Sequence, residues 1–448
     1  MSAFFSRQVD DGYRENDFRR RYNVFLKARQ EFTSSSSLTL NAGFLHQFSG
    51  QFLFWRSLDS ALIPPIKNQT DNLKSTRYYV SGLFNTILSD NTLITTKAMW
   101  SHNLWGFQQM GDAERTESKS DGFRAEISAR VSLGDHHIVT AGVDGNLDVI
   151  GGAMFESRTI GGLALYAQDE ITLSEKVSLT LGARFDLQSV GLTERSLQFN
   201  PKTAIVYNIA EGTSLRASFG RGFRVPSVAE AFIAAGGGFV RGVPNTDLKP
   251  ERSTSYEVGI SHQVFEQGSI DVAAFRSDYD NLIEPGLIIA EQNLNVQWRN
   301  VTSARVQGFE TALKLGFFED NLIYSLGYTY VYPEDRTKND ILKYRPRHLF
   351  YTNASVRLDW LSVGGDFRFV SRADRIDNEL VETGIVPDGD ERTDILVADF
   401  RFGADVSLGG VSLITTLNVK NAFQRNYVEL IGNMMPPRTY LLSLEARF

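Results

Sequence analysis

Residues 176–188 read KVSLTLGARFDLQ, and apolar side chains occupy every second position of this stretch. Successive side chains of an extended strand point to opposite faces, so the alternation predicts a strand with one apolar and one polar face. The apolar row consists of Val177, Leu179, Leu181, Ala183, Phe185 and Leu187. The polar row consists of Lys176, Ser178, Thr180, Arg184, Asp186 and Gln188.

The same alternation recurs along the whole chain, for example in 322–332, 400–408, 411–419 and 440–448. It predicts about 19 strands, mostly of about 10–14 residues, whereas globular strands average about 5–6 and a tilted strand that crosses a bilayer needs about 9–11. The predicted strands begin near residues 19, 37, 76, 92, 122, 137, 160, 176, 199, 213, 253, 268, 304, 321, 346, 361, 393, 411 and 438. Their length favours strands that cross a membrane.

The connections between these strands alternate between short turns and long polar loops. The short turns lie at 34–37, 89–91, 134–136, 174–175, 210–212, 266–268, 319–321 and 409–410. The long loops are 49–75, 105–121, 189–198, 221–252, 280–303, 334–345, 374–392 and 421–437. Outer-membrane barrels have short periplasmic turns and longer extracellular loops. The sequence therefore predicts an all-β fold, a transmembrane antiparallel β-barrel in the bacterial outer membrane.

The last strand ends on an aromatic residue, which predicts a barrel-assembly signal formed by Tyr440, Leu442, Leu444 and Phe448. The expected partners are therefore outer-membrane lipid and the barrel assembly machinery. A barrel must also pair its last strand with its first, because lipid offers no partner to a strand edge.

Composition excludes several other functions. The 448 residues carry a net charge of −7 and no cysteine, which argues against nucleic-acid binding and against thiolate chemistry. Mean hydropathy is −0.21, and no run approaches the roughly 18–20 apolar residues of a transmembrane helix. The sequence contains no nucleophile elbow, zinc motif or phosphate loop, so we expect no enzyme, no catalytic residue, no cofactor and no resident metal.

Two segments in the middle of the chain carry a more specific pattern. They read GRGFRVPSVAEAF (220–232) and NTDLKPERSTSYEVGI (245–260). They resemble the barrel of TonB-dependent outer-membrane receptors, as do 12–32, 278–283, 299–310 and 418–448. The positions that match the family motif are Gly222, Phe223, Pro226, Ser227, Glu230, Asn245, Leu248, Lys249, Pro250 and Glu251.

The resemblance implies a barrel of twenty-two strands that is preceded by a plug domain, and no segment of this sequence resembles the plug or a signal peptide. Counting back from the last strand, the chain corresponds to a single domain over 1–448. Residues 1–18 are then a remnant of strand three with its extracellular loop, and 19–448 are strands four to twenty-two. We therefore expect about 19–20 strands. They form either a 20-stranded barrel or a curved sheet with an open seam between 2–9 and 438–448.

The resemblance also implies a function, TonB-energised uptake of a scarce large solute, with a ferric siderophore as the first expectation. TonB would act through the missing plug. Three alternatives remain open, namely a cobalamin or other-solute receptor of the same family, a passive outer-membrane pore and a soluble structural β-protein.

Loop aromatic and basic residues are the candidate ligand contacts, because they could hold an anionic or catecholate siderophore by stacking and by charge. They are Trp105, Phe107, Phe239, Arg241, Trp298, Arg299, Tyr344 and Arg345. The alternative for the tryptophans and Tyr344 is a place in the aromatic girdle at the membrane interface.

Overall fold

The computed structural model describes residues 1–190, 194–233, 236–237, 240–290 and 293–447 of the chain. Twenty strands of nine or more residues run through this part. They are β1 (Ser2–Asp10), β2 (Arg19–Thr33), β3 (Ser36–Gly50), β4 (Asn72–Ser89), β5 (Thr92–Gln108), β6 (Thr116–Leu133), β7 (His137–Gly152), β8 (Phe155–Ser174), β9 (Val177–Val190), β10 (Glu194–Ala210), β11 (Thr213–Arg224), β14 (Glu251–Phe265), β15 (Gly268–Ala290), β16 (Asn293–Phe317), β17 (Leu322–Asp335), β19 (His348–Leu358), β20 (Leu361–Val370), β21 (Ile395–Leu408), β22 (Val411–Lys420) and β25 (Thr439–Arg447).

Short elements lie in the connections at one end of these strands. The short strands are β12 (Gly236–Gly237), β13 (Val240–Gly242), β18 (Asp340–Ile341), β23 (Val428–Leu430) and β24 (Asn433–Met434). The helices are α1 (Val228–Phe232), α2 (Glu379–Glu382) and two 3-10 turns, Leu58–Ser60 and Ile66–Asn68. No helix in the described ranges has the length and apolar character needed to cross a membrane.

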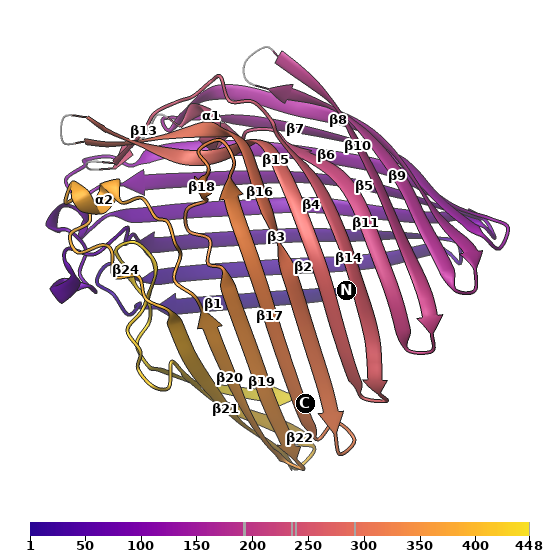
Figure 1. The fold of residues 1–448 in the computed structure, drawn as a ribbon. Coiled ribbons are helices and arrows are strands. Elements are labelled where there is room, and N and C mark those ends of the chain that lie inside the picture. The colour runs from indigo at the N-terminus through magenta and orange to yellow at the C-terminus, as the bar shows by residue number, and fades with distance from the viewer. Residues whose placement is uncertain (191–193, 234–235, 238–239, 291–292, 448) are drawn as a thin grey trace.

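Each long strand pairs antiparallel with the next long strand along the chain, so the sheet curves round in sequence order (Figure 1). Within the described residues, β1 pairs only with β2 and β25 pairs only with β22. The all-β antiparallel fold is thus confirmed. Of the two predicted forms, the structure has the curved sheet with an open seam between the first and the last strand.

The two predicted rows lie on opposite faces of the sheet. Phe185 is 50% exposed, whereas the next residue, Asp186, is 3% exposed. Arg184 belongs to the row of Asp186 and donates to Asp144 of β7 at 3.0 Å. Further along that row of β7, Ile150 packs against α1, which contacts both β8 and β16. A helix that touches two strands so far apart in the sheet lies on its concave face, so the polar row lines the interior and the apolar row faces outward.

The predicted alternation of short and long connections is wrong at three places. In the region predicted as loop 189–198, β9 and β10 stay paired as far as Val190 and Glu194. The region predicted as loop 280–303 is mostly paired, because β15 and β16 continue in register to Ala290 and Asn293. At the same end, β7 and β8 are joined by only two residues, 153–154. A hairpin that extends beyond the bilayer satisfies its own backbone hydrogen bonds, so strands need not stop where their apolar row stops. The remaining predicted strands begin within a few residues of the observed ones.

Candidate functional site

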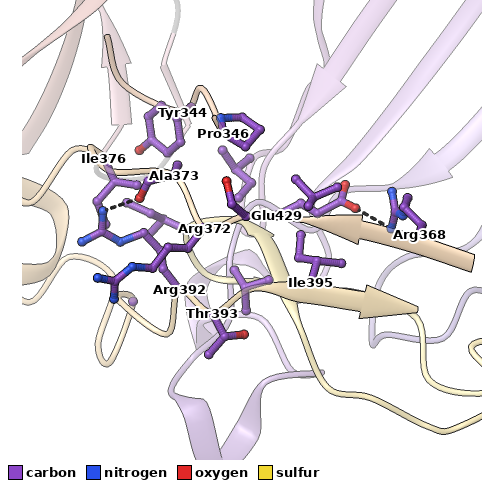
Figure 2. A pocket seen from close by; sticks show the side chains of 16 residues that line it. Tyr344, Pro346, Arg368, Arg372, Ala373, Ile376, Arg392, Thr393, Ile395 and Glu429 are labelled. Atoms are coloured by element: carbon purple, nitrogen blue, oxygen red, sulfur yellow. Dashed lines mark hydrogen bonds and ion pairs between the residues drawn. The ribbon is translucent and has the colours of Figure 1, made fainter. Parts of the chain in front are cut away.

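A cavity of about 240 Å³ lies at the long-loop end of the sheet, where the loop 371–394 and the hairpin β23–β24 meet the ends of β20 and β21 (Figure 2). Its lining residues come from segments that are far apart in the sequence. They are Tyr344, Pro346, Arg368, Val370, Ser371, Arg372, Ala373, Ile376, Gly389, Arg392, Thr393, Ile395, Val428, Glu429, Leu430 and Ile431.

Apolar side chains form one wall of this cavity. Ile395 is 6% exposed and belongs to a buried cluster with Val397 and Tyr427, against which Val370 packs. Asp366 lies in the same row of β20 as Val370 and pairs with Arg401 on the concave face. The loop 421–438 therefore folds back over the concave face, and its Tyr427 covers the ends of β20 and β21.

Arg368 of β20 connects this wall to the loop above it. Its guanidinium forms an ion pair with Glu429 at 2.9 Å and donates to the phenolic oxygen of Tyr427 at 3.2 Å. Burial raises the pKa of the Tyr427 phenol, so the phenol stays neutral and accepts this bond. The side chain of Arg368 remains 41% exposed, so part of its guanidinium is open to a ligand.

Arg392 orders the loop 371–394. It makes two bonds to Asp390, at 2.6 and 2.9 Å, and donates to the carbonyl oxygens of Ala373 and Asp374 at 3.0 and 3.1 Å. Hydrogen bonds from Arg392 lower the pKa of the Asp390 carboxyl. The bidentate geometry needs the planar fork of arginine, because lysine is a point charge.

Tyr344 closes one side of the cavity. Its hydroxyl donates to Asp377 Oδ2 at 3.1 Å, and the other oxygen of Asp377 accepts from Lys343. Burial raises the pKa of the Tyr344 phenol above its usual value, so the phenol stays neutral and its hydroxyl remains a hydrogen-bond donor. The ring of Tyr344 adds an apolar wall to the cavity.

The cavity lining is positively charged overall. Three of its residues are arginines and one, Glu429, is acidic. Glu429 pairs with Arg368, and Asp390 pairs with Arg392, so the uncompensated positive charge of the lining is that of Arg372. Arg372 contributes its backbone N–H to Asp394 at 2.9 Å, and its guanidinium has no hydrogen-bond or ion-pair partner within the described ranges. Guanidinium groups beside aromatic and aliphatic walls bind planar anionic ligands by charge, hydrogen bonding and stacking.

Of the predicted ligand contacts whose side chains the structure describes, only Tyr344 lines this cavity. Trp105 and Trp298 instead pack against a second cluster, formed around Val228 and Phe232 of α1. All its buried members except Ile283 of β15 belong to the loop 225–250, which folds onto the concave face. A role for the tryptophans in ligand contact stays a prediction.

The other predicted contacts are dispersed. Arg345 lies 3.8 Å from Glu284, and Arg299 donates to Gln297 at 3.3 Å. Phe107 is half-buried on β5 and pairs across the sheet with Thr116. Arg241 lies on β13, but its side chain is not described, and Phe239 lies outside the described residues. Of the predicted assembly signal, Tyr440, Leu442 and Leu444 are exposed on β25, and Phe448 lies outside the described residues.

The motif of the two middle segments holds the loop 225–250 in place. Ser227 caps α1 in a reciprocal capping box with Glu230. Arg224 bridges Glu230 and Glu251, each at 2.7 Å, and so ties the helix to β14. Leu248 is 4% exposed. These residues hold α1 and its loop at the long-loop end of the sheet, which is called the mouth below.

The remaining motif positions support the same loop. Asn245 donates to the carbonyl oxygen of Trp298 at 2.7 Å, and the backbone N–H of Lys249 donates to Asn300 at 2.9 Å. Gly222 and Phe223 lie at the end of β11, while Pro226 and Pro250 fall where regular pairing stops.

Sequence reasoning did not select Arg368, Arg372 and Arg392. The alternation of β20 does indicate an inward position for Arg368, because Arg368 follows Asp366 in the polar row of that strand. The two loop arginines carried none, because only the packing of the loop 421–438 onto 371–394 brings them beside Glu429.

Comparisons with known proteins agree with this architecture. A family model described as "TonB dependent receptor-like, beta-barrel" matches residues 2–422. The ferrienterobactin receptor of Escherichia coli K12 is 27% identical over 211 residues, which is 43% of this chain. That alignment spans only 27% of the receptor's own length.

Solved structures share the fold over nearly the whole chain. The ferric-catecholate import receptor Fiu of E. coli K12 superposes with a TM-score of 0.75 at 17% identity, covering 99% of this chain and 76% of Fiu. The siderophore receptor PirA of Acinetobacter baumannii gives a TM-score of 0.75 at 16% identity, covering 96% of this chain and 71% of PirA.

Proposed function

This chain belongs to the TonB-dependent receptor β-barrel family of the bacterial outer membrane, and from that premise we propose that it forms the wall and outer mouth of a ferric siderophore receptor. The proposal concerns recognition and passage of a solute, with no catalytic step. Relatives named for ferrienterobactin and for catecholate siderophores support the choice of ligand class.

The cationic cavity at the mouth is the observation that carries the proposal. Ferric catecholates are anionic and present flat aromatic rings at their surface. Arg372 offers positive charge beside the ring of Tyr344, and Arg368, which pairs with Glu429, keeps part of its guanidinium exposed. In a partly dehydrated cavity such charges attract an anion more strongly than they would in open water.

In this proposal the chain supplies strands four to twenty-two of a family barrel, with β1 as strand three. Energised uptake through TonB would be a property of the complete receptor. The outward apolar rows would contact lipid, and β25 would present the signal to the assembly machinery.

Binding of an anionic ferric tris(catecholate) complex to the refolded chain in lipid nanodiscs tests this function. Arg372→Gln is the most informative variant, because the Arg372 guanidinium bonds to no described residue and its loss leaves the loops intact. Each charge-assisted contact contributes about 1.5–3 kcal/mol, so the affinity should fall by about 10- to 150-fold. Arg357→Gln is the matched control, since Arg357 lies at the opposite end of β19, away from the cavity.

Two further arms of the experiment separate the alternatives. Cyanocobalamin in place of the iron complex tests the cobalamin alternative, and single-channel conductance tests the passive pore. Equal affinity of the unaltered and Arg372→Gln proteins for the ferric complex would remove the cavity from the account. Strong cobalamin binding, or a large steady conductance without ferric binding, would replace the proposed function.

A further inference from the structure

Loops from opposite sides of the open seam interlock at the outer end of the sheet. The loops 11–18 and 51–71 follow β1 and β3, on one side, and the loops 371–394 and 421–438 precede β21 and β25, on the other. In Figure 1, α2 and β24 lie at the same end of the molecule as the indigo N-terminal loops. Within the described residues β1 and β25 do not pair with each other, so these loops connect the two sides instead.

Trp55 is at the centre of this connection. It is fully buried, with a relative exposure of 0%. Its ring nitrogen Nε1 donates to the carbonyl oxygen of Pro387 at 2.8 Å, and its backbone N–H donates to the carbonyl oxygen of Gly432 at 2.8 Å. One residue of the loop 51–71 therefore holds both loops from the far side of the seam.

Apolar packing reinforces these two bonds. Phe54 belongs to a buried cluster with Ile376, Val386 and Ile431. Gly432 has φ +72°, and a Cβ added to it would lie 2.6 Å from the Cβ of Phe54. The backbones approach so closely there that only glycine fits.

Polar contacts complete the connection along the seam. The Tyr13 hydroxyl donates to the carbonyl oxygen of Met434 at 2.8 Å, and Arg14 Nη1 donates to Asn433 Oδ1 at 2.8 Å. Asn433 in turn donates to the carbonyl oxygen of Leu53 at 2.7 Å. The contacts involve side chains and backbone of all four loops, so they form a connected network.

The same far-side loops carry the cationic cavity. Ile376 and Ile431 belong to both the Phe54 cluster and the cavity lining, and Tyr344 lines the cavity and packs against that cluster. Arg392 lies five residues beyond Pro387, and Glu429 lies three residues before Gly432. Loss of Trp55 would therefore release the two segments that place Arg392 and Glu429.

We propose that Trp55 is a positioning residue for the ligand cavity, and that the cavity is assembled only when the loop 51–71 is locked across the seam. The part of this inference that concerns the ligand rests on the proposed function. The structural part does not, because the order of the two loops is measurable without a ligand.

Hydrogen exchange of the chain in nanodiscs tests the structural part with two substitutions of Trp55. Trp55→Ala removes a fully buried aromatic side chain, so amide protection in 384–390 and 428–434 should fall by about a hundredfold or more. Trp55→Phe keeps most of the apolar contact and loses the Nε1 bond, so protection should fall by only about fivefold. Trp360→Ala is the control, because Trp360 is 56% exposed at a short turn of the opposite end.

Binding of the ferric tris(catecholate) complex to the same variants tests the link to the cavity. Trp55→Ala should lose binding while Trp360→Ala retains it. Unchanged loop protection in Trp55→Ala would overturn the proposal, and so would lost protection with unchanged affinity for the complex. If even the unaltered protein fails to bind the complex, the proposed ligand is wrong, and a loss of protection in Trp55→Ala still supports the positioning of the loops.

Trp55→Phe carries the test alone if Trp55→Ala does not insert into the membrane, because it removes only the Nε1 bond to Pro387. A fall of protection confined to 384–390 and 428–434 would support the locked arrangement, and unchanged protection there would contradict it.

Discussion

Leu165→Arg is predicted to destabilise the chain in a bilayer far more than Gln168→Arg, a substitution three residues further along β8. Leu165 lies near the middle of this 20-residue strand, is 55% exposed, and pairs with Val143 and Phe185 of the neighbouring strands. All three belong to the outward apolar row. A new guanidinium there would face hydrocarbon, where an arginine on the lipid face of a barrel costs about 2–4 kcal/mol near the midplane.

Gln168→Arg is the matched control for this substitution. Gln168 belongs to the polar row of the concave face and donates to Glu170 at 2.9 Å. An arginine at this position would keep an acidic partner and face the interior, so its effect should stay within about 0.5 kcal/mol.

Equilibrium unfolding of both variants by denaturant in phospholipid vesicles measures the difference. A cost of about 2–4 kcal/mol corresponds to a shift of about 30- to 700-fold in the folding equilibrium for Leu165→Arg. Equal losses in the two variants, or a larger loss in Gln168→Arg, would refute the assignment of the two faces.

Three further predictions concern the mouth of the sheet. Glu230→Ala removes half of a capping box and one of the two partners of Arg224, so amide exchange in 228–233 should rise by about tenfold. Gly432→Ala forces a side chain into left-handed backbone against Phe54, so the free energy of unfolding should fall by more than about 1 kcal/mol in a denaturant titration. Hydrogen bonds from Arg392 lower the pKa of the Asp390 carboxyl. The ion pair therefore stabilises the loop 371–394 fully at pH values above about 4, the ordinary carboxyl pKa, and this stabilisation is lost as the pH falls through the lowered pKa. Proteolysis of the loop should therefore increase only below about pH 4, and in Asp390→Asn it should already be increased at neutral pH.

The strands of the sheet could be predicted because each one carries its own signal. In 176–188 the alternation alone assigns Phe185 and Asp186 to opposite faces, and no distant contact is needed for that inference. The starts of most strands follow in the same way. The extension of β15 and β16 was missed because 280–303 contains polar residues and a proline, which are typical of loops as well as of a hairpin that stands in water.

The mouth could not be predicted to the same depth. The contact between Trp55 and Pro387 joins residues that are 332 positions apart, and nothing in either local sequence indicates the other. The cavity likewise depends on how the loops 336–347, 371–394 and 421–438 pack. The choice of aromatic and basic loop residues as candidate ligand contacts found Tyr344, which lines the cavity. The same choice also selected Trp105 and Trp298, which pack beside α1.

A single-cysteine scan of residues 177–188 in a lipid bilayer tests the central claim most directly, since every introduced thiol is the only one in the chain. Thiols at 178, 180, 184 and 188 should react with a charged, water-soluble reagent, because that row lines the interior. Thiols at 179, 181, 185 and 187 should react only with a membrane-soluble reagent. Uniform reactivity along the segment, or a period near 3.6 residues, would contradict an outward apolar row on a bilayer-crossing strand.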